Sequence, residues 1–99
     1  MSLETSSRPG GTGPALTVIT VRYFAGAKAA AGVGSEQLAL PEAGTVADAV
    51  ALLRARHGER MARVLSASSL LLDEVAVRDR DQPLPAGAIL DVLPPFAGG

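Results

Sequence analysis

The sequence contains no cysteine and only one histidine among its 99 residues. The lack of cysteine excludes disulfides, thiolate metal sites and cysteine nucleophiles, and it is compatible with a reducing compartment. A single histidine, His57, cannot form a multi-histidine metal site. We therefore expect neither a metal centre nor a histidine-paired nucleophile.

Long apolar runs and a strong charge imbalance are also lacking. No segment approaches the roughly 18 apolar residues that a membrane-spanning helix needs. The formal net charge of −1 gives no reason to expect a nucleic acid or an anionic membrane as partner. Residues 1–14 lack the basic and apolar stretches of a signal peptide. We expect a cytoplasmic protein that binds neither nucleic acid nor membrane.

What the sequence does contain is typical of one small globular domain. It is 47% hydrophobic and 19% charged, which suits a folded core. Residues 1–15 are rich in serine, glycine, threonine and proline, so we expect a flexible N-terminal tail. Residues 16–93 are expected to form the domain, and residues 94–99 an extended C-terminal tail.

The first expected strand covers Leu16–Phe24, where β-forming residues alternate with polar ones. Ile19, Val21 and Tyr23 would face a core. Phe24 falls on the other face, beside Arg22. It is either a strand-end residue under the next turn or a contact for a partner, and the strand pattern leaves both readings open.

The main helix has the clearest local signals in the sequence. Thr45 is a good N-cap, and Asp48 three residues later resembles a capping box. Gly58 is placed to end the helix, after basic residues and His57 that favour its C-terminal dipole. The buried stripe follows helical spacing and consists of Val46, Ala49, Val50 and Leu53.

Shorter elements complete the expected fold. Alanine-rich and apolar patterns predict short helices over residues 25–34 and 59–66, and strands over residues 35–40, 69–78 and 88–93. The side chain of Leu84 is expected to be buried between two turns. This order and length suit an α+β fold of the β-grasp, ubiquitin-like type, with a mixed sheet packed on one main helix.

No cluster of side chains suggests catalysis. The position of His57 at a helix end accounts for it structurally. The acidic pairs Asp73–Glu74 and Asp79/Asp81 adjoin arginines and are typical of a solvated turn. The glycines of residues 10–13 lack the strand, the GK[ST] sequence and the helix of a phosphate loop. We therefore expect that the chain is not an enzyme on its own.

The last six residues are the most distinctive segment. Pro94 and Pro95 should form a stiff, extended stalk after the last strand. Gly98 and Gly99 lack side chains, so this backbone could enter a narrow channel. The group so delivered would be the α-carboxylate of Gly99, which another protein could activate. The alternative is an ordinary frayed end.

Several of these motifs together resemble the small, sulfur-carrying subunit of molybdopterin synthase, in the ubiquitin-like sulfur-carrier family. The similarity spans residues 16–99. Arg78-Asp79 and Gly87-Ala88 depart from the turn residues usual in that family. The matching stretches are Val21-Arg22-Tyr23-Phe24-Ala25, Gly32, Thr45-Val46, Leu84-Pro85-Ala86-Gly87 and Pro94-Pro95-Phe96-Ala97-Gly98-Gly99.

The resemblance implies a mechanism and partners. An ATP-dependent enzyme would adenylate Gly99 and then convert it to a thiocarboxylate. The sulfur would pass to cyclic pyranopterin monophosphate in the large, catalytic subunit, within a heterotetramer. This chain would bind no cofactor itself. Phe24 and Leu93 would dock on the large subunit, and the inserted tail would comprise Pro94, Pro95, Phe96, Ala97 and Gly98.

Other uses of the same tail remain open. The thiocarboxylate could serve thiamine, cysteine or tRNA thiolation, although thiamine carriers are usually shorter. Gly99 could instead form an isopeptide bond to lysines, as in a ubiquitin-like modifier. Finally, the chain could be a non-covalent interaction module with an inert tail.

Overall fold

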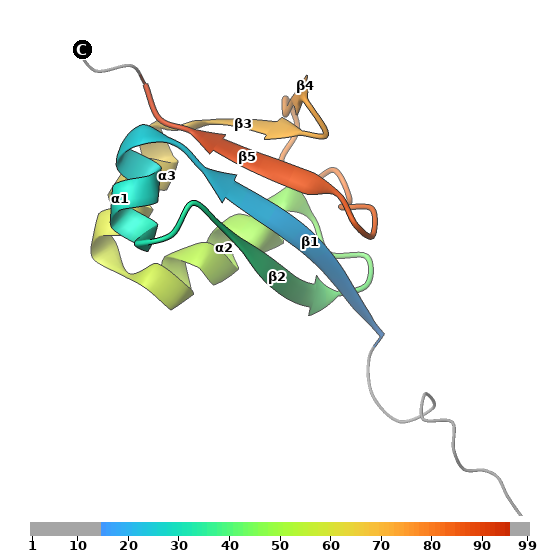
Figure 1. The fold of residues 1–99 in the computed structure, drawn as a ribbon. Helices are drawn as coiled ribbons and strands as arrows, with labels where there is room; N and C mark the ends of the chain where they lie inside the picture. Colours follow the sequence, from blue (N-terminus) through green and yellow to red (C-terminus); the bar gives the residue numbers. More distant parts are fainter. Residues whose placement is uncertain (1–14, 96–99) are drawn as a thin grey trace, which may run out of the picture.

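The computed structural model describes residues 15–95 (Figure 1). The predictions for the N-terminal tail up to residue 14 and for Phe96–Gly99 lie outside the described residues. The elements, in chain order, are β1 (Leu16–Tyr23), α1 (Ala25–Ala31), β2 (Ser35–Pro41), α2 (Val46–His57), α3 (Glu59–Ala67), β3 (Ser69–Leu72), β4 (Val75–Ala76) and β5 (Ile89–Leu93).

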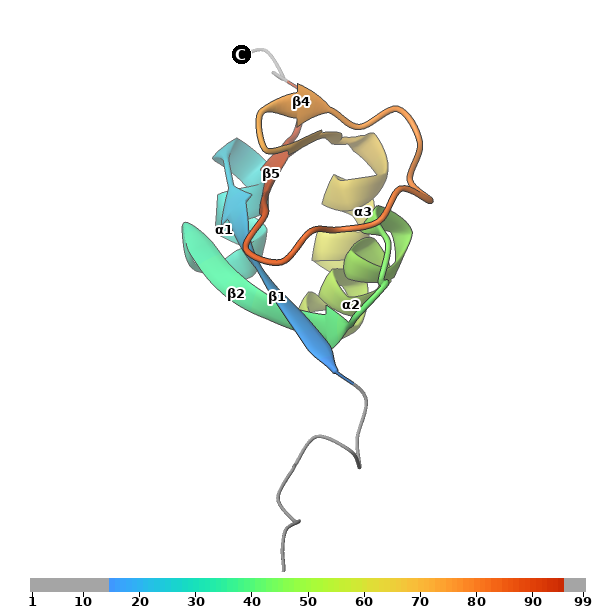
Figure 2. The same ribbon diagram turned by 90° about the vertical axis from the view of Figure 1, so that its right-hand side faces the viewer.

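The five strands form one mixed sheet in the order β2-β1-β5-β3-β4. The strand pairs are antiparallel except β1 and β5, which run parallel in the centre. The sheet curves around α2 and α3 (Figure 2). This arrangement is the predicted α+β, ubiquitin-like β-grasp fold, and that prediction is confirmed.

The alternating pattern of β1 divides the sheet into two faces. Ile19, Val21 and Tyr23 point toward the helices and are buried, as predicted. Residues between them point to the opposite side, which we call the outer face, because successive side chains of a strand alternate. Arg22 and Phe24 therefore belong to the outer face.

Local sequence signals decide where α2 begins and ends. The backbone N–H of Asp48 donates to Thr45 Oγ1 at 3.2 Å, and the Thr45 N–H donates to Asp48 Oδ2 at 2.9 Å, so the predicted capping box is present. Gly58 has a φ of 88° and separates α2 from α3, as expected of glycine. All four predicted stripe residues of α2 are buried against the sheet.

The predicted continuous strand over residues 69–78 is wrong. The chain instead turns back at Asp73 and Glu74, whose φ angles are 48° and 71°, and only Val75–Ala76 return as β4. The Asp73 N–H donates to the Ile89 carbonyl at 2.8 Å, and Asp73 Oδ1 accepts from the Ile89 N–H at 2.9 Å. These contacts with the start of β5 stabilise a turn that the apolar pattern did not reveal.

One loop residue completes the core. Leu84 is buried, as predicted, and its N–H donates to the Gly44 carbonyl at 3.0 Å, which ties the loop before β5 to the start of α2. Of the helices in the described part of the chain, none has the length and hydropathy to cross a membrane.

Candidate functional site

The tail leaves the sheet from its centre. β5 lies between β1 and β3 and runs directly into Pro94 (Figure 1). The Phe24 N–H donates to the Val92 carbonyl at 3.3 Å, so Phe24 lies beside the end of β5. Leu93 pairs with Ser69 on the other side. The structure thus brings Phe24 and Leu93 together at the point where the tail begins.

These side chains form an apolar rim on the outer face. Phe24 is 40% exposed, and it follows the inward-facing Tyr23. Leu93 is half-buried and follows the inward-facing Val92. Pro94 is half-buried and Pro95 is exposed. We call Phe24, Leu93, Pro94 and Pro95 the tail base.

The backbone of Phe24 is fixed on both sides. Its N–H is bound to β5, and its carbonyl accepts from the Ala27 N–H at 2.9 Å in the first turn of α1. An exposed aromatic ring on a fixed backbone loses little conformational freedom when a partner covers it. The exposed part of the ring leaves an apolar surface that a partner could cover, and the docking role of Phe24 stays a prediction.

An ion pair joins Arg22 of β1 to Asp91 of β5, each of which lies two residues before a member of the tail base. Arg22 Nε donates to Asp91 Oδ1 at 2.6 Å and Nη2 donates to Oδ2 at 2.9 Å. The Asp91 side chain is only 6% exposed, whereas that of Arg22 is 42% exposed. The hydrogen bond and the negative charge of Asp91 raise the pKa of Arg22 above its ordinary value. Strand periodicity alone did not predict this pair, although an aspartate inside an apolar strand is a signal of a buried charge that needs a partner.

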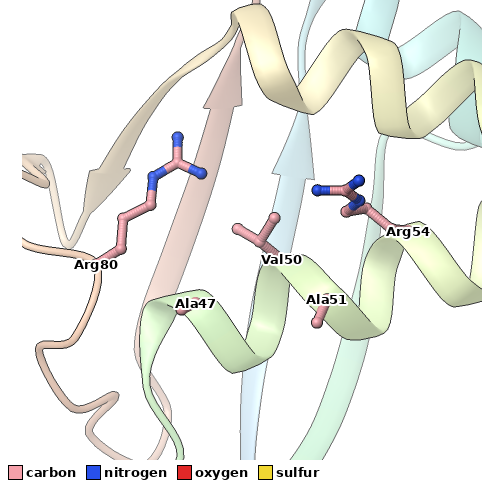
Figure 3. Close-up of a pocket in the computed structure, with 5 residues that line it drawn as sticks. All are labelled: Ala47, Val50, Ala51, Arg54 and Arg80. Carbon is pink, nitrogen blue, oxygen red and sulfur yellow. The ribbon is translucent and has the colours of Figure 1, made fainter.

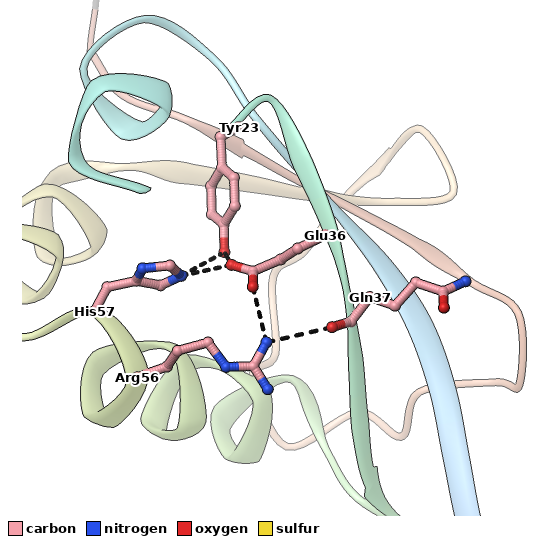
Figure 4. Close-up of polar contacts among 5 residues, drawn as sticks. All are labelled: Tyr23, Glu36, Gln37, Arg56 and His57. Atoms are coloured by element: carbon pink, nitrogen blue, oxygen red, sulfur yellow. Dashed lines mark hydrogen bonds and ion pairs between the residues drawn. The ribbon is translucent and has the colours of Figure 1, made fainter. Parts of the chain in front are cut away.

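A second polar cluster lies on the helix side of the sheet (Figure 4). Glu36 of β2 accepts hydrogen bonds from the Tyr23 hydroxyl and, at 2.8 Å, from Arg56 Nη1. His57 Nε2 lies 2.5 Å from Glu36 Oε2 and 3.4 Å from the Tyr23 hydroxyl. We call these four residues the Glu36 cluster. His57 lies at the end of a helix, as predicted, but its partners Glu36 and Tyr23 were not predicted from the sequence.

The Glu36 cluster shifts the pKa values of two of its members. Burial acts to raise the pKa of Glu36, but hydrogen bonds from Tyr23, His57 and Arg56 outweigh it and lower that pKa below its ordinary value. Burial, followed by the hydrogen bond to Glu36, raises the pKa of the Tyr23 hydroxyl. The cluster therefore joins β1, β2 and the end of α2 around one ionised carboxylate.

The described residues offer one apolar surface, the tail base, and two groups of paired polar side chains. Within residues 15–95, no three histidine, cysteine, aspartate or glutamate side chains are grouped as metal ligands. The tail base supplies apolar contact, and Arg22 and Asp91 neutralise each other. Gly99 and the other residues of Phe96–Gly99 lie outside the described residues, so their role stays a prediction.

Comparisons with known proteins give one matching family and several solved structures with a similar fold. The model of the ThiS family matches residues 21–99. A putative molybdopterin converting factor subunit 1 from Pyrococcus furiosus superposes with a TM-score of 0.74 at 26% identity, covering 81% of this chain and 99% of that one. No curated protein matches the sequence.

Two further solved structures share the fold at lower identity. Small archaeal modifier protein 1 from Haloferax volcanii superposes with a TM-score of 0.74 at 24% identity, covering 83% of this chain and 99% of that one. A Helicobacter pylori complex of subunits 1 and 2 of molybdopterin-converting factor contains a chain with a TM-score of 0.59 at 22% identity, covering 84% of this chain and all of that one.

Proposed function

The chain belongs to the ThiS family of ubiquitin-like sulfur carriers, and from this we propose that it is the small subunit of a molybdopterin synthase, with Gly99 as its sulfur-carrying residue. The observation that carries the proposal is the family match itself, because it continues through the Gly-Gly end of the sequence. The similarity to a putative molybdopterin converting factor subunit 1 supports the choice of pathway.

The proposed chemistry starts from a carboxylate that is a poor electrophile. An activating enzyme would transfer AMP from ATP to the Gly99 carboxylate and release pyrophosphate. Sulfide released by a sulfur donor would then attack the acyl-adenylate, displace AMP and leave a thiocarboxylate. Attack of this sulfur on a side-chain carbon of cyclic pyranopterin monophosphate would displace an oxygen leaving group from that carbon and form a thioester. Water would then cleave the bond between the Gly99 carbonyl and the sulfur, which returns the Gly99 carboxylate and leaves the sulfur on the pterin. ATP is consumed by the activating enzyme and is not a cofactor of this chain.

The tail base is the surface through which this chain would bind the large subunit. A large subunit would cover Phe24 and Leu93, and the segment from Pro94 to Gly98 would enter its active site. The Helicobacter pylori structure holds a subunit 1 in complex with a subunit 2, which supports a large partner of this kind. We propose a heterotetramer of two small and two large subunits, located in the cytoplasm.

A second candidate function is protein modification through Gly99. It is favoured by the structure of small archaeal modifier protein 1, whose TM-score equals that of the Pyrococcus protein. In this case, the activated Gly99 carbonyl would form an isopeptide bond with a lysine amine and release the activating group. Carriers for thiamine, cysteine or tRNA thiolation share the thiocarboxylate and differ in the acceptor.

Mass spectrometry of the full chain, purified from a host that supplies the activating enzyme, tests these proposals. A sulfur carrier should show one oxygen replaced by sulfur at Gly99, and the thiocarboxylate form should convert cyclic pyranopterin monophosphate to molybdopterin when the large subunit is added. Lysine adducts without thiocarboxylate would support the modifier. If the chain forms a thiocarboxylate but yields no molybdopterin with the large subunit, it serves another thiolation pathway.

A further inference from the structure

A pocket on the helix side of the molecule contains two arginines that the proposed sulfur transfer does not use. It has a volume of about 350 Å³ and is lined by Ala47, Val50, Ala51, Arg54 and Arg80 (Figure 3). Four of these residues come from α2, and Arg80 comes from the loop between β4 and β5. The strands lie behind α2 in this view, so the pocket opens away from the outer face and the tail base.

Small side chains on α2 create the hollow. Ala47 and Ala51 are four residues apart, so they lie one above the other on the same side of the helix. Val50 is almost completely buried and forms an apolar floor. Arg54 lies one turn beyond Val50, and Figure 3 shows that both guanidinium groups point toward Val50 from opposite sides. The result is an apolar surface between two positive charges.

The loop that carries Arg80 is held firmly against α2. The Ala47 N–H donates to the Arg80 carbonyl at 2.8 Å, and the Val46 N–H donates to the Gln82 carbonyl at 3.1 Å. The Asp81 N–H donates to Asp79 Oδ1 at 2.9 Å within the same turn. The backbone of Arg80 is therefore fixed before any ligand arrives, which reduces the entropy cost of binding.

The charges of the pocket are available to a ligand. Arg54 and Arg80 are both exposed, and neither forms an ion pair with another residue of the described range 15–95. The first amides of α2 are already bound to loop carbonyls, and Thr45 and Asp48 cap each other. The helix end therefore offers few free N–H groups to a phosphate.

We propose that this pocket docks an acidic segment of a partner protein, in which carboxylates flank an apolar side chain. The apolar side chain would cover Val50, and carboxylates would pair with Arg54 and Arg80, for which guanidinium groups are well suited. A nucleic acid is disfavoured because the pocket, as lined by the described residues, has only two arginines to contact phosphates and no aromatic side chain on which a base could stack. This inference is independent of the fate of Gly99.

Titration of the isotope-labelled full chain with a short peptide of alternating glutamate and leucine tests the proposal. Nuclear magnetic resonance should show shifts at Ala47, Ala51 and the guanidinium groups of Arg54 and Arg80. A glutamine-for-glutamate peptide should bind much more weakly. Shifts that centre on other residues, or equal binding of both peptides, would overturn the proposal.

Matched variants separate a defined pocket from general charge attraction. The double variant Arg54→Gln/Arg80→Gln should weaken peptide binding by about tenfold, because both charge-assisted contacts are lost. The control Arg60→Gln/Arg63→Gln removes the same charge from α3 and should leave affinity nearly unchanged. Equal losses in the two double variants would contradict a defined site.

A second pair of variants tests the shape of the pocket at constant charge. Ala51→Leu should fill the hollow and weaken binding, whereas Ala29→Leu on the exposed side of α1 should not; both positions are exposed, so both variants should fold. Unchanged binding by Ala51→Leu would contradict the proposal. Pyrophosphate or a short single-stranded DNA that binds the same residues more tightly than the peptide would also overturn it.

Discussion

Arg22 and Asp91 are unequal partners in their ion pair. The carboxylate of Asp91 is buried, whereas the guanidinium of Arg22 reaches solvent. Removal of one partner therefore has different consequences in the two cases. Without Arg22, a buried charge loses its only charged partner among the described residues, whereas Arg22 without Asp91 can be hydrated.

We accordingly predict that Arg22→Ala lowers the free energy of unfolding more than Asp91→Ala does. Urea denaturation of the two single variants and of the double variant provides the measurement, and a double-mutant cycle isolates the pair. The double variant should be more stable than Arg22→Ala alone, because the buried carboxylate is gone. Equal losses in the single variants would contradict this account.

Phe24 is predicted to act in binding more than in folding. Because the ring is 40% exposed, Phe24→Ala should cost little stability, about 1 kcal/mol or less, and should weaken association with the large subunit by about tenfold or more. Isothermal titration with the large subunit and thermal unfolding of the free chain measure the two effects.

Leu52→Ala is the matched control for Phe24→Ala. Leu52 is 39% exposed on α2, so its truncation removes a similar exposed apolar side chain from another part of the surface. It should leave the affinity for the large subunit unchanged. If both variants weaken binding equally, or if neither does, Phe24 does not belong to the docking surface.

At the scale of elements, the Glu36 cluster fastens the end of α2 to the two neighbouring strands. Arg56 also donates to the Gln37 carbonyl at 3.3 Å, so the contact extends along β2. The Tyr23 and His57 rings meet edge-on with centroids 5.9 Å apart. The helix that covers the core is thus held at its start by the capping box and at its end by this cluster.

The lowered pKa of Glu36 predicts a pH-dependent contribution to stability. The folded state binds this proton more weakly than the unfolded chain, so the stabilisation is complete above the ordinary pKa of the unfolded glutamate and is lost as the pH falls through the lower folded pKa. Glu36→Gln should therefore reduce the free energy of unfolding most near neutral pH, and the difference from the wild type should shrink in acid.

Chemical denaturation of wild type and Glu36→Gln across this pH range measures the effect. Glu42→Gln is the control, because Glu42 is exposed and its side chain makes no ion pair within residues 15–95. Its difference from the wild type should stay small at every pH. A constant difference for Glu36→Gln would show that the carboxylate charge does not stabilise the cluster.

At the scale of the whole molecule, the residues that form the buried core are separate from the C-terminal tail that would deliver sulfur. The buried core of the described residues extends from Ile19 to Val92 and includes no residue of the tail. The sheet curves around the helices (Figure 2), and the buried apolar side chains of β1 and β5 point toward these helices. Changes at the end of the chain should therefore leave the fold intact.

We predict that deleting Gly99, or adding one residue after it, abolishes sulfur transfer without changing thermal stability. The reactive carboxylate would be lost or displaced, while the core would be untouched. Complementation of a strain that lacks the chain, read as molybdoenzyme activity, measures function, and calorimetry measures stability. Restored activity with the extended chain would contradict a role for Gly99.

Much of the fold followed from signals that act within a few residues. The capping box of Thr45 and Asp48, the stripe of α2 and the alternation of β1 all depend on helical or strand periodicity, so the sequence predicted them correctly. The turn at Asp73 and Glu74 was missed because its support comes from Ile89, sixteen residues away from Asp73. Apolar periodicity carries no information on such a partner.

By itself, the sequence determined the β-grasp class, the main helix with its cap, and the resemblance that singled out Phe24, Leu93 and the Gly-Gly tail. Only the tertiary structure decided which charges meet. The Arg22–Asp91 pair and the Glu36 cluster join residues 13 to 69 positions apart. Their contacts depend on strand register and helix packing, which bring distant residues within hydrogen-bonding distance only after the chain has folded.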